Sequence, residues 1–358
     1  MDFVDLTDWL IRNAGPVIKY RTVVDLCDEQ NVGIVEVLLK NLFASPLVKY
    51  WLSRLKSTID LKQLHSSNPD AYENVMGKLV QLGMRAGLQP FDNKTLPFRI
   101  WLSDYNNYSA PLSVFYQTIV ASFLSYAGYG NITPVFSHLK KRLAALYSFA
   151  RDPDFDSIYI DKTKVKGFPK GRHYDSHRLV NPELYPNKQF MLPWVHDIRG
   201  IASCREIMDD SLWREKAESV IEMILTQDYQ NIPFSYGIAD YGGKYYVIGW
   251  AVNLPGYYTK PTERNFAWLL RTMEYMARFE AGRKSSWFQK SLEYLEDFQT
   301  NDGIYFFPHA WLPEKNMGYW VHGAYMGLEE NRRTKKTIEI ESTFWILWIR
   351  HLAGSVNP

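Results

Sequence analysis

The stretch Lys290-Ser-Leu-Glu-Tyr-Leu-Glu-Asp-Phe-Gln299-Thr-Asn-Asp-Gly303-Ile-Tyr305 carries most of the information about the fold. Two leucines three residues apart and then Gln299 lie at i, i+3 and i+7, which is the spacing of one helix face. Gly303 predicts a stop and a turn, because glycine readily adopts the left-handed conformation that ends helices. In such a turn the Gln299 amide can bond the frayed helix end, and Tyr305 can pack back over it.

A looser copy of this pattern lies upstream. Apolar pairs between Ala217 and Leu225 lead into Gln230 and then Gly237, with the Gln later than in the first copy. The two glutamines lie about seventy residues apart, each after a predicted helix. Repeats of this kind indicate supersecondary units that bury their apolar faces against neighbouring units.

The first copy resembles the repeat of the squalene/hopene cyclase-like α/α toroids, the superfamily that includes terpenoid cyclases and protein prenyltransferases. The matching residues are Lys290, Ser291, Tyr294, Leu295, Gln299, Gly303 and Tyr305, with Ser in place of Gly or Ala and Tyr in place of Trp. The resemblance implies a mainly α fold, an α/α toroid of helical hairpins that forms one domain over residues 1–358. It covers about the last half of the chain.

The chain departs from that superfamily in its acidic motifs. Asp-x-Asp-Asp and Asp-Asp-x-x-Asp are absent, and Asp152, Asp154 and Asp156 alternate with other residues. Triterpene cyclisation is therefore not supported. Asp25-Leu-Cys27 is only superficially like the zinc-binding pair of the prenyltransferases, and we expect no metal and no cofactor.

Composition narrows the functional classes. A net charge of +2 over 358 residues, with basic residues dispersed, argues against nucleic-acid binding. Two cysteines make no disulfide framework, the start of the chain lacks the basic region of a signal peptide, and no apolar run is long enough to span a membrane. A cytoplasmic location is expected, and the oligomeric state stays open. The 15% aromatic content suits an aromatic-lined cavity or a thick core.

The predicted organisation is a series of helices broken by two irregular regions. Residues 1–60 are a possible helical N-terminal extension, in which Val17, Tyr20, Val24 and Cys27 predict one buried stripe. Further helices are predicted over 69–90 (closed by Gly87 and Pro90), 109–126, 133–149, 262–281, 285–300 and 337–351. Residues 151–190 and 232–261 are rich in Pro, Gly and Tyr and predict irregular loops, with a hairpin near Tyr241-Gly-Gly243.

Four groups of residues are candidates for chemistry, and they lie at 172–178, 192–199, 308–323 and 339–343. Histidines oriented by carboxylates transfer protons near neutral pH. The catalytic candidates are His173, Asp175, His177, His196, Asp197, His322 and Glu341. The substrate-binding candidates, whose rings could stabilise a cation or stack on a ligand, are Arg172, Trp194, Tyr236, Trp250, His309, Trp311 and Trp320.

Three functions fit this inventory. The leading hypothesis is an enzyme that applies acid/base chemistry to a small hydrophobic or isoprenoid-like substrate in a central aromatic-lined cavity. A carbohydrate-active toroid (a lyase, epimerase or hydrolase) would use the same residues and stack sugars on Trp. A non-catalytic binding or scaffold protein would scatter them over its surface. The fold alone does not choose among the three.

Overall fold

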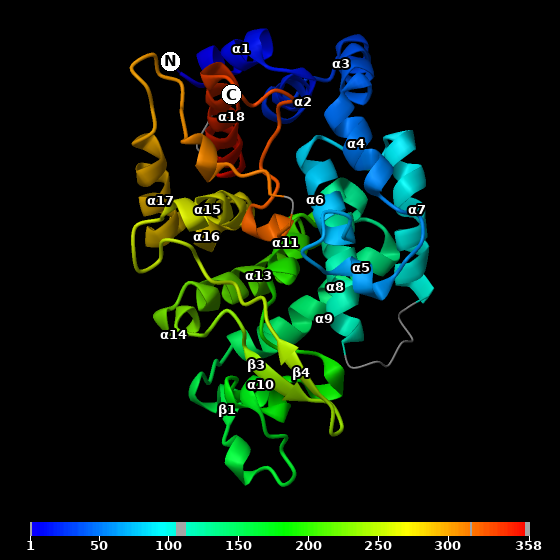
Figure 1. Ribbon diagram of the computed structural model, residues 1–358, viewed down its shortest axis with the longest axis vertical. Helices are drawn as coiled ribbons and strands as arrows, with labels where there is room; N and C mark the ends of the chain where they lie inside the picture. Colours follow the sequence, from blue (N-terminus) through cyan, green and yellow to red (C-terminus); the bar gives the residue numbers. More distant parts are fainter. Residues whose placement is uncertain (1, 105–111, 316, 355–358) are drawn as a thin grey trace. The chain divides into compact units, whose positions relative to one another are not determined.

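The computed structural model describes residues 2–104, 112–315 and 317–354. Within these ranges the chain forms eighteen α-helices and four short strands, which confirms the predicted mainly α class (Figure 1). The chain divides into two compact units. Unit 1 comprises residues 1–98 and 255–358, and unit 2 comprises residues 99–254, so unit 2 interrupts unit 1 in the sequence. The α/α toroid and the single domain stay predictions.

Unit 1 is helical. Its helices are α1 (Phe3–Asn13), α2 (Pro16–Arg21), α3 (Val32–Ala44), α4 (Pro46–Arg54), α5 (Leu61–Leu64), α6 (Tyr72–Gln81), α15 (Glu263–Met276), α16 (Glu280–Lys284), α17 (Ser286–Glu296) and α18 (Lys335–Leu352). Helix α7 (Gln89–Asp104) begins in unit 1 and ends in unit 2.

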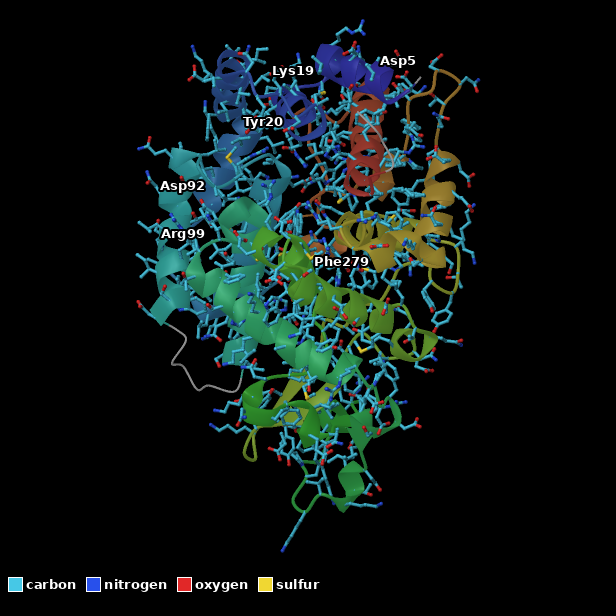
Figure 2. The ribbon with its side chains drawn as sticks, turned by 180° about the vertical axis from the view of Figure 1, so that it is seen from behind. Asp5, Lys19, Tyr20, Asp92, Arg99 and Phe279 are labelled. Carbon is cyan, nitrogen blue, oxygen red and sulfur yellow. The ribbon has the colours of Figure 1, made fainter. Side chains whose placement is uncertain are left out.

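The apolar centre of unit 1 lies around α15 and α18. Phe266, Leu270 and Met273 of α15 follow helical spacing and are fully buried. Helix α18 is buried on nearly every side from Ile340 to Ile349, and it packs against α1 and α15 (Figure 1). Side chains fill the space between these helices (Figure 2). The core therefore follows from the apolar periodicity of the C-terminal helices.

Helix α6 adds a polar edge to this core. Lys78 is fully buried, and its Nζ donates to Glu314 Oε1 and to the Tyr325 carbonyl, both at 3.1 Å. Burial lowers the pKa of Lys78, and the Glu314 carboxylate opposes that shift. Gln81 Nε2 donates to the Met326 carbonyl at 3.0 Å. These bonds fix the irregular segment 314–327 along α6.

The turn after α17 has part of the predicted construction: Tyr305 returns to the helix, but the helix ends at Glu296 and Gln299 bonds the turn rather than the helix end. Gln299 Nε2 donates to the Gly303 carbonyl at 3.1 Å, and Gly303 has a left-handed φ of 81°. Tyr305 is fully buried and returns to the helix, where its hydroxyl donates to Glu296 Oε2 at 2.6 Å. In the upstream copy, Gln230 Nε2 donates to the Ile224 carbonyl at 2.8 Å. Gln230 thus bonds the last residue of α13, as predicted, whereas Gln299 bonds the turn that follows its helix.

Unit 2 combines helices with a small sheet. Its helices are α8 (Ser113–Leu124), α9 (Thr133–Ala150), α10 (Arg172–Asp175), α11 (Val195–Ala202), α12 (Arg205–Met208), α13 (Ser211–Ile224) and α14 (Gln227–Gln230). Helix α8 packs against α9 and α11. Helices α8 and α11 approach each other closely at Gly200 of α11. A Cβ at this position would lie 2.9 Å from the Ser122 Cα of α8.

The sheet of unit 2 joins the two regions that the sequence predicts to be irregular. Its order is β1 (Tyr159–Ile160), β2 (Leu179–Val180), β3 (Gly237–Asp240) and β4 (Tyr245–Ile248). Strands β3 and β4 form the predicted hairpin, with Ile238 opposite Val247. The strands in 151–190 were not predicted, because β2 pairs in parallel with β3, which is distant in the sequence.

Two local predictions near the N-terminus are wrong. Cys27 is exposed, because residues Thr22–Leu26 form a π-helical turn that shifts the helical face and buries Leu26 instead. The helix predicted over 69–90 ends at Gln81, since Gly83 takes a φ of 97°, and Pro90 lies in the first turn of α7 rather than beyond a helix end. The predicted helix start at 109–111 lies outside the described residues.

Neither of the two 18-residue helices, α9 and α18, is apolar enough to cross a lipid bilayer, and every other helix in the described ranges is shorter.

Replacing Gly77 with Ala tests the packing of α6. A Cβ at this position would lie 2.3 Å from Cδ2 of the buried Trp320, so the indole must shift. We expect G77A to lower the free energy of unfolding by about 1–3 kcal/mol, measured by urea denaturation. G33A in the exposed first turn of α3 is the matched control and should not destabilise the protein. A wild-type stability for G77A would contradict this packing.

Glu329 should make stability depend on pH. Burial raises its pKa from 4.5 to about 7; Glu341 and Glu330 add to the shift, whereas the Gly15 N–H, which donates to Glu329 at 2.9 Å, and Lys19 oppose it. Because the folded-state pKa is the higher one, this contribution to stability is complete below pH 4.5 and is lost as the pH rises through about 7.

We therefore expect E329Q to flatten the fall in unfolding free energy between pH 5 and pH 8, measured by urea denaturation. E330Q, which changes the neighbouring exposed carboxylate, should keep most of the wild-type slope. An E329Q variant with the full wild-type slope would show that another group titrates.

Candidate functional site

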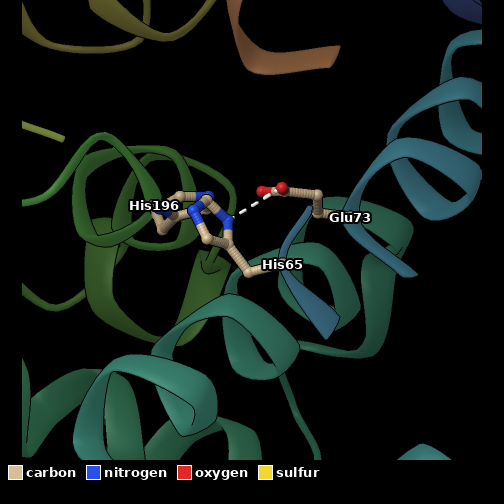
Figure 3. A group of neighbouring side chains, drawn as sticks. All are labelled: His65, Glu73 and His196. Carbon is tan, nitrogen blue, oxygen red and sulfur yellow. Dashed lines mark ion pairs between the residues drawn. The ribbon is translucent and has the colours of Figure 1, made fainter. Parts of the chain in front are cut away.

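The strongest arrangement for chemistry in unit 1 is a histidine paired with a buried carboxylate. His65 Nδ1 lies 2.8 Å from Glu73 Oε1 (Figure 3). The Glu73 side chain is completely buried, and that of His65 is 15% exposed. His65 directly follows α5, and Glu73 is the second residue of α6. At this distance the carboxylate forms an ion pair with the imidazolium form of the ring and so favours a proton on Nδ1.

Asn74 holds the pieces of this site together. Its Nδ2 lies 2.8 Å from the Asn68 carbonyl, in the turn between His65 and Glu73, and 2.9 Å from the Gly318 carbonyl. Its Oδ1 accepts from the Trp320 N–H at 2.8 Å. One buried side chain thus fixes α6, the turn after His65 and the segment around residue 319.

That segment brings aromatic rings to the pair. The Tyr319 ring stacks on the His65 ring, with centroids 5.1 Å apart. Burial and the Glu73 charge raise the pKa of Tyr319, so its phenol stays protonated at neutral pH. The predicted catalytic residue His322 lies in the same segment, 4.8 Å from Trp268 and 6.5 Å from Tyr319 between ring centroids.

The chemistry open to this group is proton transfer. A histidine oriented by a buried carboxylate serves as a general base, and its imidazolium serves as a general acid. Imidazole and carboxylate are also zinc ligands, and a metal held by His65 and Glu73 would need further ligands from water, substrate or other protein groups. The absence of a metal and of a cofactor stays a prediction.

The other predicted residues of unit 1, apart from the exposed His309, contribute to its packing. His309 is exposed, and Trp311 packs 5.0 Å from Phe266 between ring centroids. Trp320 is buried, with the Arg271 guanidinium 3.9 Å from its ring centroid. Glu341 is buried and accepts hydrogen bonds that anchor segment 328–332, from Leu328 N at 2.7 Å, Glu329 N at 3.0 Å and Arg332 Nε at 2.8 Å. A catalytic role for Glu341 stays a prediction.

Unit 2 gathers five predicted residues around α11. The fully buried His196 ring lies 5.8 Å from Trp250 and 5.7 Å from Phe115 between ring centroids. The Val195 N–H donates to the Trp250 carbonyl at 3.0 Å, and Trp250 has an unusual φ of 71°. The buried residues Trp194, Asp197 and Tyr236 complete the group, and Tyr236 donates to the Pro193 carbonyl at 2.6 Å. Three of the predicted aromatic residues thus share one buried or half-buried cluster, and their role in substrate binding stays a prediction.

Asp197 is committed to a buried ion pair within this cluster. Its two carboxylate oxygens accept from Arg142 Nε and Nη2, both at 2.9 Å, and both side chains are fully buried. Oδ2 also accepts from the Trp194 N–H at 3.0 Å, which caps the start of α11. The guanidinium lies 4.5 Å from the Trp194 ring centroid. Asp197 therefore orients α11 and Trp194, and its catalytic role stays a prediction.

Two of the remaining candidates line a hollow of about 510 Å³ in unit 2. Asp175 and His177 line it, and Arg172 is exposed at the start of α10. Lys162 Nζ donates to three backbone carbonyls here, including those of Asp175 at 2.9 Å and His177 at 3.1 Å. The side chain of His173 lies outside the described part of the chain.

No sequence pattern pointed to four residues of these sites, which are His65, Glu73, Tyr319 and Arg142. His65 stands in a polar turn, and Glu73 resembles the acids that favour any helix start. A histidine eight residues before a carboxylate could have been considered, but the pairing depends on the fold of the turn between them. The sequence around Arg142 did not indicate a buried ion pair, because this arginine lies in an ordinary amphipathic helix pattern.

No protein-family model, curated protein or solved structure matches this chain.

Replacing Asp197 with Asn tests its structural role. The amide keeps a hydrogen-bond acceptor for the Trp194 N–H but leaves the Arg142 guanidinium buried without a counter-charge. We expect D197N to lower the free energy of unfolding by about 3–5 kcal/mol, measured by urea denaturation. D175N, at an exposed position, is the matched control and should unfold like the wild type. Equal stability of D197N and D175N would contradict the buried pair.

Proposed function

We propose that this protein is an enzyme that transfers a proton to or from a small, largely apolar substrate, with His65 as the acid/base group. The observation that carries this proposal is the 2.8 Å contact between His65 Nδ1 and the fully buried Glu73 carboxylate. A buried carboxylate is costly unless a partner compensates it, and here the partner is an imidazole, the side chain best suited to proton transfer near neutral pH.

In this proposal Glu73 is a positioning residue. It keeps the proton of His65 on Nδ1 and stabilises the imidazolium that forms when Nε2 takes a proton from the substrate. Tyr319, stacked on the imidazole and protonated, restricts the ring and supplies a hydroxyl donor. This arrangement is typical of general acid/base catalysis, which contributes about 10²–10⁴-fold to a rate.

The aromatic surroundings support an apolar substrate. The Trp268 ring lies tilted against His322 and the Tyr319 ring lies edge to face with it. Aromatic rings favour apolar or transiently cationic groups over strongly hydrated ones. A small hydrophobic or isoprenoid-like molecule therefore fits better than a phosphorylated one. The α/α-toroid architecture belongs to the same proposal, and the Gln-and-aromatic turn after α17 supports it.

The test follows turnover without assuming a substrate. Purified protein is incubated with a cellular extract of small apolar metabolites, and mass spectrometry identifies compounds that are consumed. We expect H65A to slow their conversion by at least about 100-fold. E73Q should slow it as well, because a neutral amide stabilises the imidazolium less than a carboxylate does.

H351A is the matched control, since His351 lies near the end of α18 and belongs to none of the candidate groups. It should convert the same compounds at the wild-type rate. Thermal unfolding of each variant separates loss of activity from loss of fold. The proposal fails if folded H65A converts these compounds at the wild-type rate. It also fails if the wild type consumes no compound that H65A leaves unconverted.

A further inference from the structure

A hollow in unit 1 has the features of a ligand site, and one of its walls comes from the stretch that suggested the fold. It lies between the loop 255–261 and α17 and has a volume of about 400 Å³. Its walls include Tyr257 and Tyr258 from the loop and Tyr294 from the helix. Sites of this size accommodate small ligands. None of its residues belongs to the His65 group.

The tyrosine rings offer faces for stacking. Tyr258 is 57% exposed, although it is a large aromatic residue, and its ring meets Tyr257 edge to face at 4.8 Å between centroids. The Tyr294 hydroxyl donates to the Pro261 carbonyl at 3.4 Å, which sets the ring of the helix residue against the loop. An exposed ring beside two partly buried ones presents apolar surface that a ligand could cover.

The loop is fixed before any ligand binds. Trp287 Nε1 donates to the Pro255 carbonyl at 2.8 Å and ties the start of the loop to α17. Gly256 has a φ of 83°, and a Cβ there would lie 2.8 Å from Pro261 Cγ, so the loop closes tightly on itself. A rigid loop loses little conformational entropy on binding, which favours affinity.

The charges of the hollow balance. Lys260 and Lys290 face Glu293 and Asp297, two positive against two negative groups. Lys260 lies 3.3 Å from Asp297, with both side chains largely exposed, and 4.8 Å from the Tyr294 ring centroid. Because the positive and negative charges are equal in number, the hollow does not favour an anionic or a cationic ligand. Ammonium donors and carboxylate acceptors side by side match hydroxyl groups, which both donate and accept.

We propose that this hollow binds a neutral saccharide. The Tyr258 and Tyr294 rings would stack on the apolar face of a sugar ring, while Lys290 and Glu293 would bond its hydroxyls. Rings with apolar bodies and polar tips suit ligands that have one apolar face and a hydroxyl-rich rim. This binding function is separate from the proposed proton transfer, and it would hold a sugar-bearing ligand or glycan near the protein without reacting with it.

The experiment measures binding by titration calorimetry. The full-length protein is titrated with four neutral hexasaccharides, built from α-1,4-linked glucose, β-1,4-linked glucose, β-1,4-linked xylose and β-1,4-linked N-acetylglucosamine. We expect at least one to bind, and Y258A to weaken that binding at least about 10-fold, as expected for loss of an aromatic anchor. Y50A, which removes a tyrosine of similar exposure (51%) on α4, is the matched control and should bind like the wild type.

H65A should bind the same saccharide with unchanged affinity, so failure of the acid/base proposal and failure of this one give different results. Absence of binding for all four hexasaccharides would overturn the proposal. Equal loss of affinity in Y50A and Y258A, or full affinity in folded Y258A, would also overturn it, because the sugar would then bind elsewhere.

Discussion

The hydrogen bonds of the Asn74 amide are the constraint on which the candidate site depends. His65 belongs to a turn, Glu73 to a helix and Tyr319 to a distant segment, and each could move on its own. Asn74, which is itself part of α6, bonds the turn and the distant segment at once. A buried amide left without partners costs about 1–3 kcal/mol, so these bonds form or break together. The imidazole–carboxylate distance is therefore a property of the whole arrangement.

Both units use buried polar groups to direct irregular backbone. In unit 1, Lys78 and Gln81 hold carbonyl groups of segment 314–327. In unit 2, Arg142 joins Asp197 to the Phe190 carbonyl at 2.6 Å. Apolar contacts tolerate many paths for a loop, whereas a buried cation accepts only a path that brings oxygen atoms to it. Long segments without regular structure can thus carry aromatic rings to defined positions.

The features that the sequence predicted are local ones. The turn after α17 followed from the order of Gln299, Gly303 and Tyr305, whose bonds close within a few residues. The β3–β4 hairpin followed from adjacent glycines. The exposure of Cys27 could not be foreseen, because no sequence pattern indicated the π-helical turn that changes which residues of the helix are buried. The His65–Glu73 pair was missed because contacts with residues far along the chain shape the turn between them.

The interruption of unit 1 has a consequence for biosynthesis. Asn74 and its partner Trp320 lie 246 residues apart. At about 5–20 residues per second on the ribosome, the first must wait roughly 12–50 s for the second. Unit 2 is continuous and can complete during that interval, whereas the N-terminal segment emerges with its polar helix edge hydrated and its apolar faces uncovered. The nascent chain can thus pass through a state in which unit 2 is folded while the N-terminal part of unit 1 still needs protection from aggregation.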